Sequence, residues 1–316
     1  MTERKLNIVF MGTPDFASTC LEAILESNHN VVGVVTAPDR QSGRGRKINQ
    51  SSVKKLALSK GLNIAQPEKL KSAEFHQTLN EWNADIFIVV AFRMLPEVVW
   101  DMPPMGTFNL HASLLPQFRG AAPIQRAIMQ GATKSGATVF KLTHEIDTGN
   151  ILSNVELEIG QNENAGSLHD RILTSGAQLL VDTINTIAEG KDTYTPQSEL
   201  ITGELLEAPK IFKEDKRIIW DQPCFDVHNH IRGLSPYPSA FTTLNSNEQS
   251  PIKIIEGAIS NKSHLNPGEV EITKDTILVG TQTNCYQIHR LQPAGKSSME
   301  AKSFILGLRD SIEKFD

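Results

Sequence analysis

Residues 6–14 read Leu6-Asn-Ile-Val-Phe-Met-Gly-Thr-Pro14 and decide the fold class of this chain. Their first six residues are a short apolar run, as expected for a buried strand. Thr13 can cap a helix and Pro14 can occupy its first position, so we predict a helix that continues to Glu26. A strand that turns directly into a helix is the unit from which layered α/β sheets are built.

The same alternation of strand and helix continues through the first half of the chain. Strands separated by helices imply an α/β domain with a mostly parallel, doubly wound (Rossmann-like) sheet. Ligands of such sheets bind beyond the carboxyl ends of the strands. The predicted strands are 31–36, 85–91, 107–112, 137–142 and 151–158, and the predicted helices are 51–60, 122–130 and 165–188.

The composition changes in the second half. Residues 190–207 are rich in Thr, Glu and turn residues and are interpreted as a linker between a domain at 1–189 and a domain at 208–316. Short apolar runs then alternate with Pro and Gly, which predicts a small C-terminal β-barrel. These runs are 240–244, 252–258, 269–272, 277–280 and 285–291.

Composition excludes several classes of protein. No apolar run of the 316 residues approaches the roughly 18–20 residues needed to span a bilayer. The opening residues carry no apolar signal-peptide core, so a cytoplasmic location is expected. Cys20, Cys224 and Cys285 are odd in number and far apart, which indicates neither a disulfide framework nor a thiolate metal site.

Basic residues are concentrated in one segment, although the net charge is −5. Residues 40–67 contain seven basic residues and no acidic one. Such a patch on an acidic protein can hold a polyanion at one place while the remaining surface repels it. The seven are Arg40, Arg44, Arg46, Lys47, Lys54, Lys55 and Lys60.

The strongest chemical signal lies at the end of the strand predicted at 107–112. Asn109, His111 and Ser113 alternate, so in an extended segment they point to one face. An imidazole beside an amide donor suits acyl transfer, and Asp147 in a later loop can orient the imidazole. On pattern alone a second interpretation stays open, because Asn and Ser are also common where strands end in loops.

Several motifs resemble those of the folate-dependent formyltransferases, most closely the branch that acts on methionyl-tRNA. The resemblance covers nearly the whole chain, and its most specific part is the segment from Ser113 to Gln125. The motifs are Met11-Gly-Thr-Pro-Asp-Phe-Ala17, Pro38-Asp-Arg40, Gly43-Arg-Gly-Arg-Lys47, Ser113-Leu-Leu-Pro-Gln-Phe-Arg-Gly-Ala-Ala-Pro-Ile-Gln125, Ser235-Pro-Tyr-Pro238 and Leu291-Gln-Pro-Ala-Gly-Lys296.

The resemblance implies formyl transfer from 10-formyltetrahydrofolate, without a metal, to the α-amino group of methionine on initiator tRNA. It assigns the catalytic roles to Asn109, His111 and Asp147. Asn109 and protonated His111 would donate to the developing oxyanion, and Asp147 would stabilise the imidazolium. Ser113 would hold either its loop or a substrate group.

The folate segment departs from the nearest relatives. Residues 91–96 read Ala-Phe-Arg-Met-Leu-Pro, which is one residue shorter than their pattern and resembles the branch that acts on glycinamide ribonucleotide. Arg93 replaces a glycine and is expected to reach either the folate or Glu145. The residues expected to bind the folate are Met94, Leu95, Ser113, Leu114, Leu115, Pro116, Glu145 and Ile146.

The resemblance also implies that the chain acts as a monomer on tRNA, with an OB-like C-terminal barrel. The glycines of the basic loop would allow close approach to the acceptor stem, where its cations neutralise phosphates. An ordinary solvated loop is the alternative. The residues expected to contact tRNA are Arg40, Arg44, Arg46, Lys47, Lys210 and Lys296.

Two rival functions remain open at this point. One is a formyltransferase for a nucleotide sugar or another small amine, and the other is a non-catalytic RNA-binding protein on an enzyme scaffold. The complete Asn–His–Asp set disfavours the second. A metal site at Asp226, His228 and His230 is disfavoured because a third spaced ligand or a thiolate is missing.

Overall fold

The computed structural model describes residues 4–42, 47–244, 250–308 and 312–316. The chain divides into two compact units, each built from segments that are not continuous in sequence. Unit 1 comprises Met1–Arg119, Gly136–Leu157 and Arg171–Leu206, and unit 2 comprises Gly120–Ser135, Glu158–Asp170 and Glu207–Asp316. The predicted boundaries at residues 189 and 208 come from a change in sequence composition, whereas these two units are defined by compactness in space. The domain boundaries therefore stay predictions.

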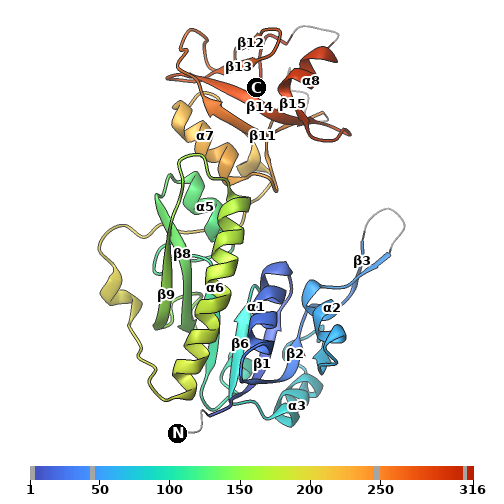
Figure 1. The fold of residues 1–316 in the computed structure, drawn as a ribbon, viewed down its shortest axis with the longest axis vertical. Coiled ribbons are helices and arrows are strands. Elements are labelled where there is room, and N and C mark those ends of the chain that lie inside the picture. The colour runs from blue at the N-terminus through green and yellow to red at the C-terminus, as the bar shows by residue number, and fades with distance from the viewer. Residues whose placement is uncertain (1–3, 43–46, 245–249, 309–311) are drawn as a thin grey trace. The chain divides into compact units, whose positions relative to one another are not determined.

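Unit 1 is built on a seven-stranded sheet with the order β5-β2-β1-β6-β7-β8-β9. The first five strands in this order pair in parallel, and β8 is antiparallel to β7. Figure 1 shows β1, β2 and β6 side by side. The mostly parallel Rossmann-like sheet is therefore confirmed. The strands are β1 Asn7–Gly12, β2 Asn30–Val35, β5 Ile64–Ala65, β6 Ile86–Val90, β7 Thr107–His111, β8 Lys134–Lys141 and β9 Ile151–Glu158.

Helices connect most of these strands, and α2 has both the N-cap residue and the terminating glycine that its sequence predicts. Helix α2, at Ser52–Ser59, is capped by Ser51, whose hydroxyl accepts from the backbone N of Lys54, and Gly61 follows it with φ +65°. The remaining helices with residues in unit 1 are α1 Asp15–Leu25, α3 Ala73–Trp82, α4 Glu97–Trp100 and α6 Ala165–Ala188.

The predicted start of α1 is wrong by one residue. Pro14, which was expected inside the helix, has extended backbone angles and is itself the N-terminal cap residue. Thr13 therefore lies outside the helix. Asp15 begins it instead and places a carboxylate in the first turn, where the helix dipole favours negative charge.

The core of unit 1 shows why β1 is apolar from Ile8 to Met11 and why β6 is apolar at every position. Val9 and Met11 of β1 pack with Phe75 and Leu79 of α3 on one face. Phe10, which lies between Val9 and Met11, and Ile8 are buried as well. Strands covered on both faces need apolar residues at every position, which matches the continuous runs in the sequence.

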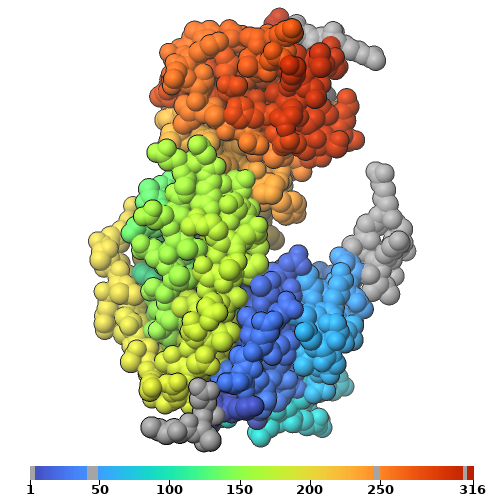
Figure 2. All heavy atoms as spheres, in the orientation of Figure 1, coloured from blue at the N-terminus to red at the C-terminus, as the bar shows by residue number. Residues whose placement is uncertain are grey.

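The segment predicted to be a linker packs against unit 1. Thr195 pairs with Ile151, and the 3₁₀ helix η1 at Gln197–Leu200 follows. Figure 2 shows this segment, coloured yellow, lying on the surface of the molecule next to neighbouring segments. Its middle residues therefore belong to the structured part of unit 1.

Unit 2 contains a second sheet, which is antiparallel and has the order β10-β11-β14-β13-β12, with β15 paired to β14. Among the described strands this order is an open path, so the antiparallel β domain is confirmed and a closed OB-like barrel is not. The strands are β10 Ala240–Thr242, β11 Ile252–Ile259, β12 Val270–Ile272, β13 Ile277–Gly280, β14 Cys285–Pro293 and β15 Met299–Glu300, and the helices are α5 Pro123–Met129, α7 Cys224–Gly233 and α8 Ala301–Leu306.

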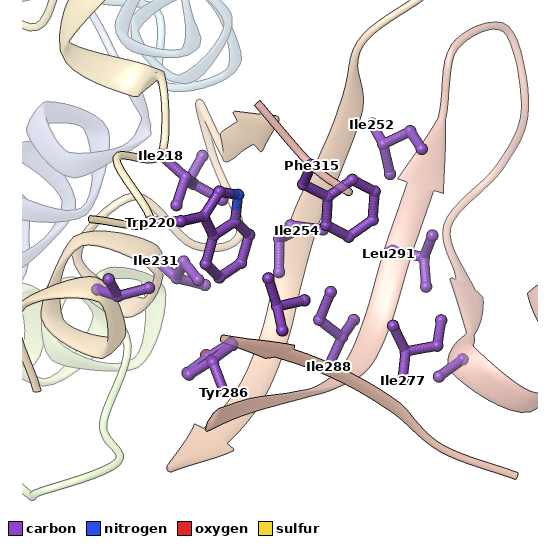
Figure 3. Packing of buried hydrophobic residues seen from close by; sticks show 14 of the residues in the cluster. Ile218, Trp220, Ile231, Ile252, Ile254, Ile277, Tyr286, Ile288, Leu291 and Phe315 are labelled. Atoms are coloured by element: carbon purple, nitrogen blue, oxygen red, sulfur yellow. The ribbon is translucent and has the colours of Figure 1, made fainter. Parts of the chain in front are cut away.

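An aromatic cluster organises the core of unit 2 (Figure 3). Phe315 stacks on Trp220 with ring centroids 6.1 Å apart and an interplanar angle of 18°. The ring of Tyr286 is tilted by 50° against the same indole, with ring centroids 6.3 Å apart. The indole N–H donates to the hydroxyl of Thr242 at 3.0 Å, so the one polar atom of Trp220 is satisfied within the core.

Candidate active site

The predicted catalytic strand ends where its chemical groups begin. β7 places Asn109 opposite Val89 of β6 and Phe140 of β8. His111 is its last residue and is only 7% exposed. The imidazole Nε2 lies 2.9 Å from the carbonyl oxygen of Phe118, which accepts from the ring N–H. The other ring nitrogen, Nδ1, is therefore the one that faces a different partner.

That partner is Asp147. Its carboxylate Oδ2 lies 3.8 Å from His111 Nδ1, and its side chain is 14% exposed. Asp147 has φ +54°, a conformation that Asp tolerates better than most residues. The structure thus brings together the imidazole and the carboxylate that the sequence placed 36 positions apart.

Ser113 does not continue the alternation, because β7 ends at His111. Its side chain is fully buried, and the hydroxyl donates to the carbonyl of Gln117 at 2.7 Å. Its own carbonyl accepts from the hydroxyl of Thr138 at 2.7 Å. Of the two roles considered for Ser113, this geometry favours holding the loop that presents the Phe118 carbonyl to His111.

Comparison with known proteins shows the family to which this chain belongs. The family model described as formyl transferase matches residues 5–184, and the model of the formyl transferase C-terminal domain matches residues 210–309. The chain belongs to the formyl transferase family.

Individual relatives agree with that assignment. A methionyl-tRNA formyltransferase from Bacteroides fragilis is 48% identical over 97% of this chain and 96% of its own length. Among solved structures, an N-formyltransferase from Helicobacter canadensis in complex with folinic acid and dTDP-3-aminofucose has a TM-score of 0.65 at 20% identity, covering 90% of this chain and 98% of that one. HypX from Aquifex aeolicus, in complex with tetrahydrofolic acid, has a TM-score of 0.65 at 17% identity. That match covers 96% of this chain but 47% of HypX, so the chain spans about half the length of HypX.

In this formyl transferase, an ion pair forms between residues next to two of the segments predicted to bind folate, those at 94–95 and 145–146. An ion pair joins Glu97 to His144, with 3.5 Å between Oε2 and Nδ1. Met94 is 75% exposed and Ile146 is 64% exposed, so each segment presents an apolar side chain to solvent. Glu145 is exposed as well.

The other predicted folate residues lie deeper in this formyl transferase. Leu95, Leu115 and Pro116 are buried, and Leu114 is half-buried. Leu115 packs in a small cluster of buried residues with Phe140 and Ile151, so its side chain belongs to the hydrophobic core. The peptide bond before Pro116 is cis.

Arg93 has a structural role that the sequence did not indicate. Its guanidinium donates to the backbone carbonyls of Pro67 and Glu68, and it lies 5.6 Å from the centroid of the Phe92 ring. Partial burial and the nearby charge of Arg40 lower its pKa. Arg93 thus contacts the backbone at residues 67 and 68 and not Glu145, while its expected contact with the folate stays a prediction.

The predicted tRNA-binding residues are only partly described. Arg40 lies in β3, Arg40–Ser42, which pairs with β4, Lys47–Asn49. Arg40, Lys210 and Lys296 are exposed. Arg44, Arg46 and the side chain of Lys47 lie outside the described residues.

One neighbouring cation has a partner. Lys54 pairs with Asp39 at 2.6 Å, and hydrogen bonds from Lys54 and Gln66 hold the pKa of Asp39 below its usual value. The positive charge of Lys54 is thus partly neutralised by Asp39.

The predicted absence of a metal site concerns the histidines of α7. No group of three or more His, Cys, Asp or Glu residues in the described part of the chain is placed to hold a metal ion. No helix in that part is long and apolar enough to cross a membrane. His228 Nε2 lies 3.3 Å from the carbonyl of Gln161, and burial lowers the pKa of both His228 and His230.

The sequence did not reveal Gln197. It lies in η1 within the predicted linker, and its amide contacts both the Asp147 loop and Arg119. A glutamine among turn residues carries no periodic or motif signal, so only the structure identifies it.

Proposed function

We propose that this formyl transferase moves the formyl group of 10-formyltetrahydrofolate to the α-amino group of methionine on initiator tRNA, giving N-formylmethionyl-tRNA for translation initiation. The pairing of His111 with Asp147 beside Asn109 carries the proposal for the chemistry. The 48% identity to a methionyl-tRNA formyltransferase over nearly the whole chain supports the acceptor.

The residues around the strand ends fit a folate. Its pteridine needs apolar contacts and backbone hydrogen-bonding groups, and Met94 and Ile146 offer exposed apolar side chains on two loops joined by the Glu97–His144 pair. Glu145 lies in the same loop as Ile146. Buried Leu95 and Leu115 would support this pocket from behind. When bound, 10-formyltetrahydrofolate supplies the formyl group that is transferred.

The catalytic residues have distinct roles in this proposal. The Asn109 amide and the Nδ1–H of protonated His111 donate to the formyl oxygen, where negative charge grows as the amine attacks. This N–H is available because Nδ1 lies 3.8 Å from Asp147, which is too far for a hydrogen bond, whereas Nε2 is engaged by the Phe118 carbonyl. Loss of one such donor typically lowers the rate on the order of 10²–10³-fold. Asp147 stabilises the imidazolium at 3.8 Å and accepts the proton that leaves the attacking amine, directly or through water. The bond between the formyl carbon and N10 of the folate then breaks, and N10 takes up that proton, so that tetrahydrofolate leaves as the second product.

The tRNA would be held by cations from both parts of the chain. Arg40, Arg44, Arg46 and Lys47 belong to the basic loop that we assign to the acceptor stem. Lys210 and Lys296 extend the contact into a C-terminal domain at 208–316, which we propose to be an OB-like nucleic-acid-binding domain. Phosphate contacts of this kind give affinity that falls steeply with salt.

We further propose that the enzyme acts as a monomer in the cytoplasm. Its three cysteines are unpaired and buried, and burial raises the pKa of the Cys20 thiol to about 12. Unpaired cysteines are typical of proteins in reducing compartments.

The acceptor can be tested against the rival small amine. Labelled 10-formyltetrahydrofolate is offered with methionyl-tRNA in one reaction and with an amino-sugar nucleotide in another. We expect label on the tRNA and none on the sugar. Label on the sugar alone would replace the proposed function by that of a nucleotide-sugar formyltransferase.

A further inference from the structure

Gln197 has an unusually complete set of hydrogen bonds for a residue in a connecting segment. Its side chain is only 3% exposed. The amide Nε2 donates to the carbonyl oxygens of Asp147 at 2.9 Å and Gly149 at 2.8 Å. The amide Oε1 accepts from Arg119 twice, from Nε at 3.0 Å and from Nη2 at 2.6 Å.

These partners fix the chemical identity of the side chain at position 197. A guanidinium offers only donors, so it requires an acceptor, and the two carbonyls require donors. A primary amide presents both in one plane, with the oxygen toward Arg119 and the nitrogen toward the loop. A carboxylate would satisfy Arg119 but would place negative charge against two carbonyl oxygens.

The two sides of this amide lead to the two partners of the catalytic imidazole. Arg119 follows Phe118, whose carbonyl accepts from His111 Nε2. Asp147 provides the carboxylate that faces His111 Nδ1. Gln197 therefore links the segments that hold both ring nitrogens of His111.

The Asp147 loop needs such an anchor. Residues 143–146 are exposed, and Asp147 has φ +54°. Gly149 runs so close to β8 that a Cβ there would lie 1.7 Å from the carbonyl oxygen of Lys141. The backbone at 147 and 149 is thus held by Gln197 on one side and confined by β8 on the other.

We propose that Gln197 is a positioning residue for formyl transfer, which fixes the Asp147 carboxylate against His111 through the loop backbone. This inference rests on the proposed function, because its readout is the rate of formylation. Small misplacement of a catalytic group lowers turnover without changing how substrate is held, so kcat rather than KM should respond.

The test uses a double-mutant cycle with two pairs of variants in the full-length chain. Gln197→Met keeps the side-chain length and removes every hydrogen bond of the amide. We expect it to lower kcat by about tenfold to a hundredfold, with the KM for methionyl-tRNA within about threefold of wild type. In an Asp147→Asn background the same change should cost less than about threefold, because the group that it positions is already lost. Gln178→Met, on the exposed face of α6, is the matched control and should leave kcat unchanged.

Gln197→Glu guards against loss of folding in the Met variant. It retains an acceptor for Arg119 and removes both donors to the loop, so kcat should fall in this variant as well. Equal losses in the wild-type and Asp147→Asn backgrounds, or unchanged kcat in Gln197→Glu, would overturn the inference. If the unaltered chain itself transferred no formyl group to methionyl-tRNA, the proposed function would fail first, which is a separate outcome.

Discussion

Replacing Asp147 with Asn isolates the charge of the carboxylate from its shape. Asn has nearly the same size and also tolerates the positive φ of +54° found at this position. The backbone carbonyl that accepts from Gln197 is unaffected by the change. The variant therefore removes negative charge next to His111 while leaving the loop in place.

The magnitude follows from the separation of the pair. Unit charges 3.8 Å apart interact by about 4 kcal/mol at an effective dielectric constant of about 20. Since about 1.4 kcal/mol changes a rate tenfold, the loss of kcat has a ceiling of about 10³-fold. Both side chains are largely buried, so screening by solvent is small and we expect a fall on the order of 10²–10³-fold.

The assay is steady-state transfer of labelled formyl to methionyl-tRNA, with kcat and KM measured separately. The KM for tRNA should stay within about threefold of wild type, because the carboxylate acts mainly in the transition state. Glu199→Gln is the charge control, since Glu199 is exposed in the neighbouring η1 helix. A loss of kcat below about threefold in Asp147→Asn would refute the proposed role of the ion pair.

Three further predictions concern the rest of the chain. Phe315→Ala should destabilise unit 2 by about 3–5 kcal/mol, because it removes the ring stacked on Trp220; a denaturant midpoint unchanged from wild type would contradict this. Arg44→Ala should raise the KM for methionyl-tRNA while leaving folate binding unchanged, and equal loss of both would reject its assignment to tRNA. Burial lowers the pKa of His228 and His230 in the folded state, so their contribution to stability is present above the unfolded pKa of about 6.5 and is lost as pH falls below it. Thermal unfolding between pH 7 and pH 5 should show that loss in the wild type and a flatter profile in His230→Asn.

The sequence predicted those parts of the fold whose periodicity and end signals agree. Strand β6 is apolar at every position and was found within one residue at each end. Helix α3 was missed, because Phe75 and Leu79 are its only buried residues and polar residues surround them. The start of α1 was misjudged because a Thr-Pro pair fits two positions of a helix start, and only the backbone of Pro14 decides between them.

The site was predictable where it depends on a strand and not where it depends on loops. Asn109 and His111 share a face by simple alternation in β7. Arg93 illustrates the limit, because its partners are backbone carbonyls of a turn 25 and 26 residues earlier. Gln197 is a similar case, since its contacts depend on how a connecting segment returns to the sheet. Backbone carbonyls as partners leave no pattern in a sequence.

The proposed function is best tested by the transfer of labelled formyl from 10-formyltetrahydrofolate to purified initiator methionyl-tRNA, with elongator methionyl-tRNA in a parallel reaction. We predict N-formylmethionine on the initiator and none on the elongator. Absence of label on both tRNAs, from an enzyme that still binds the folate, would contradict the account.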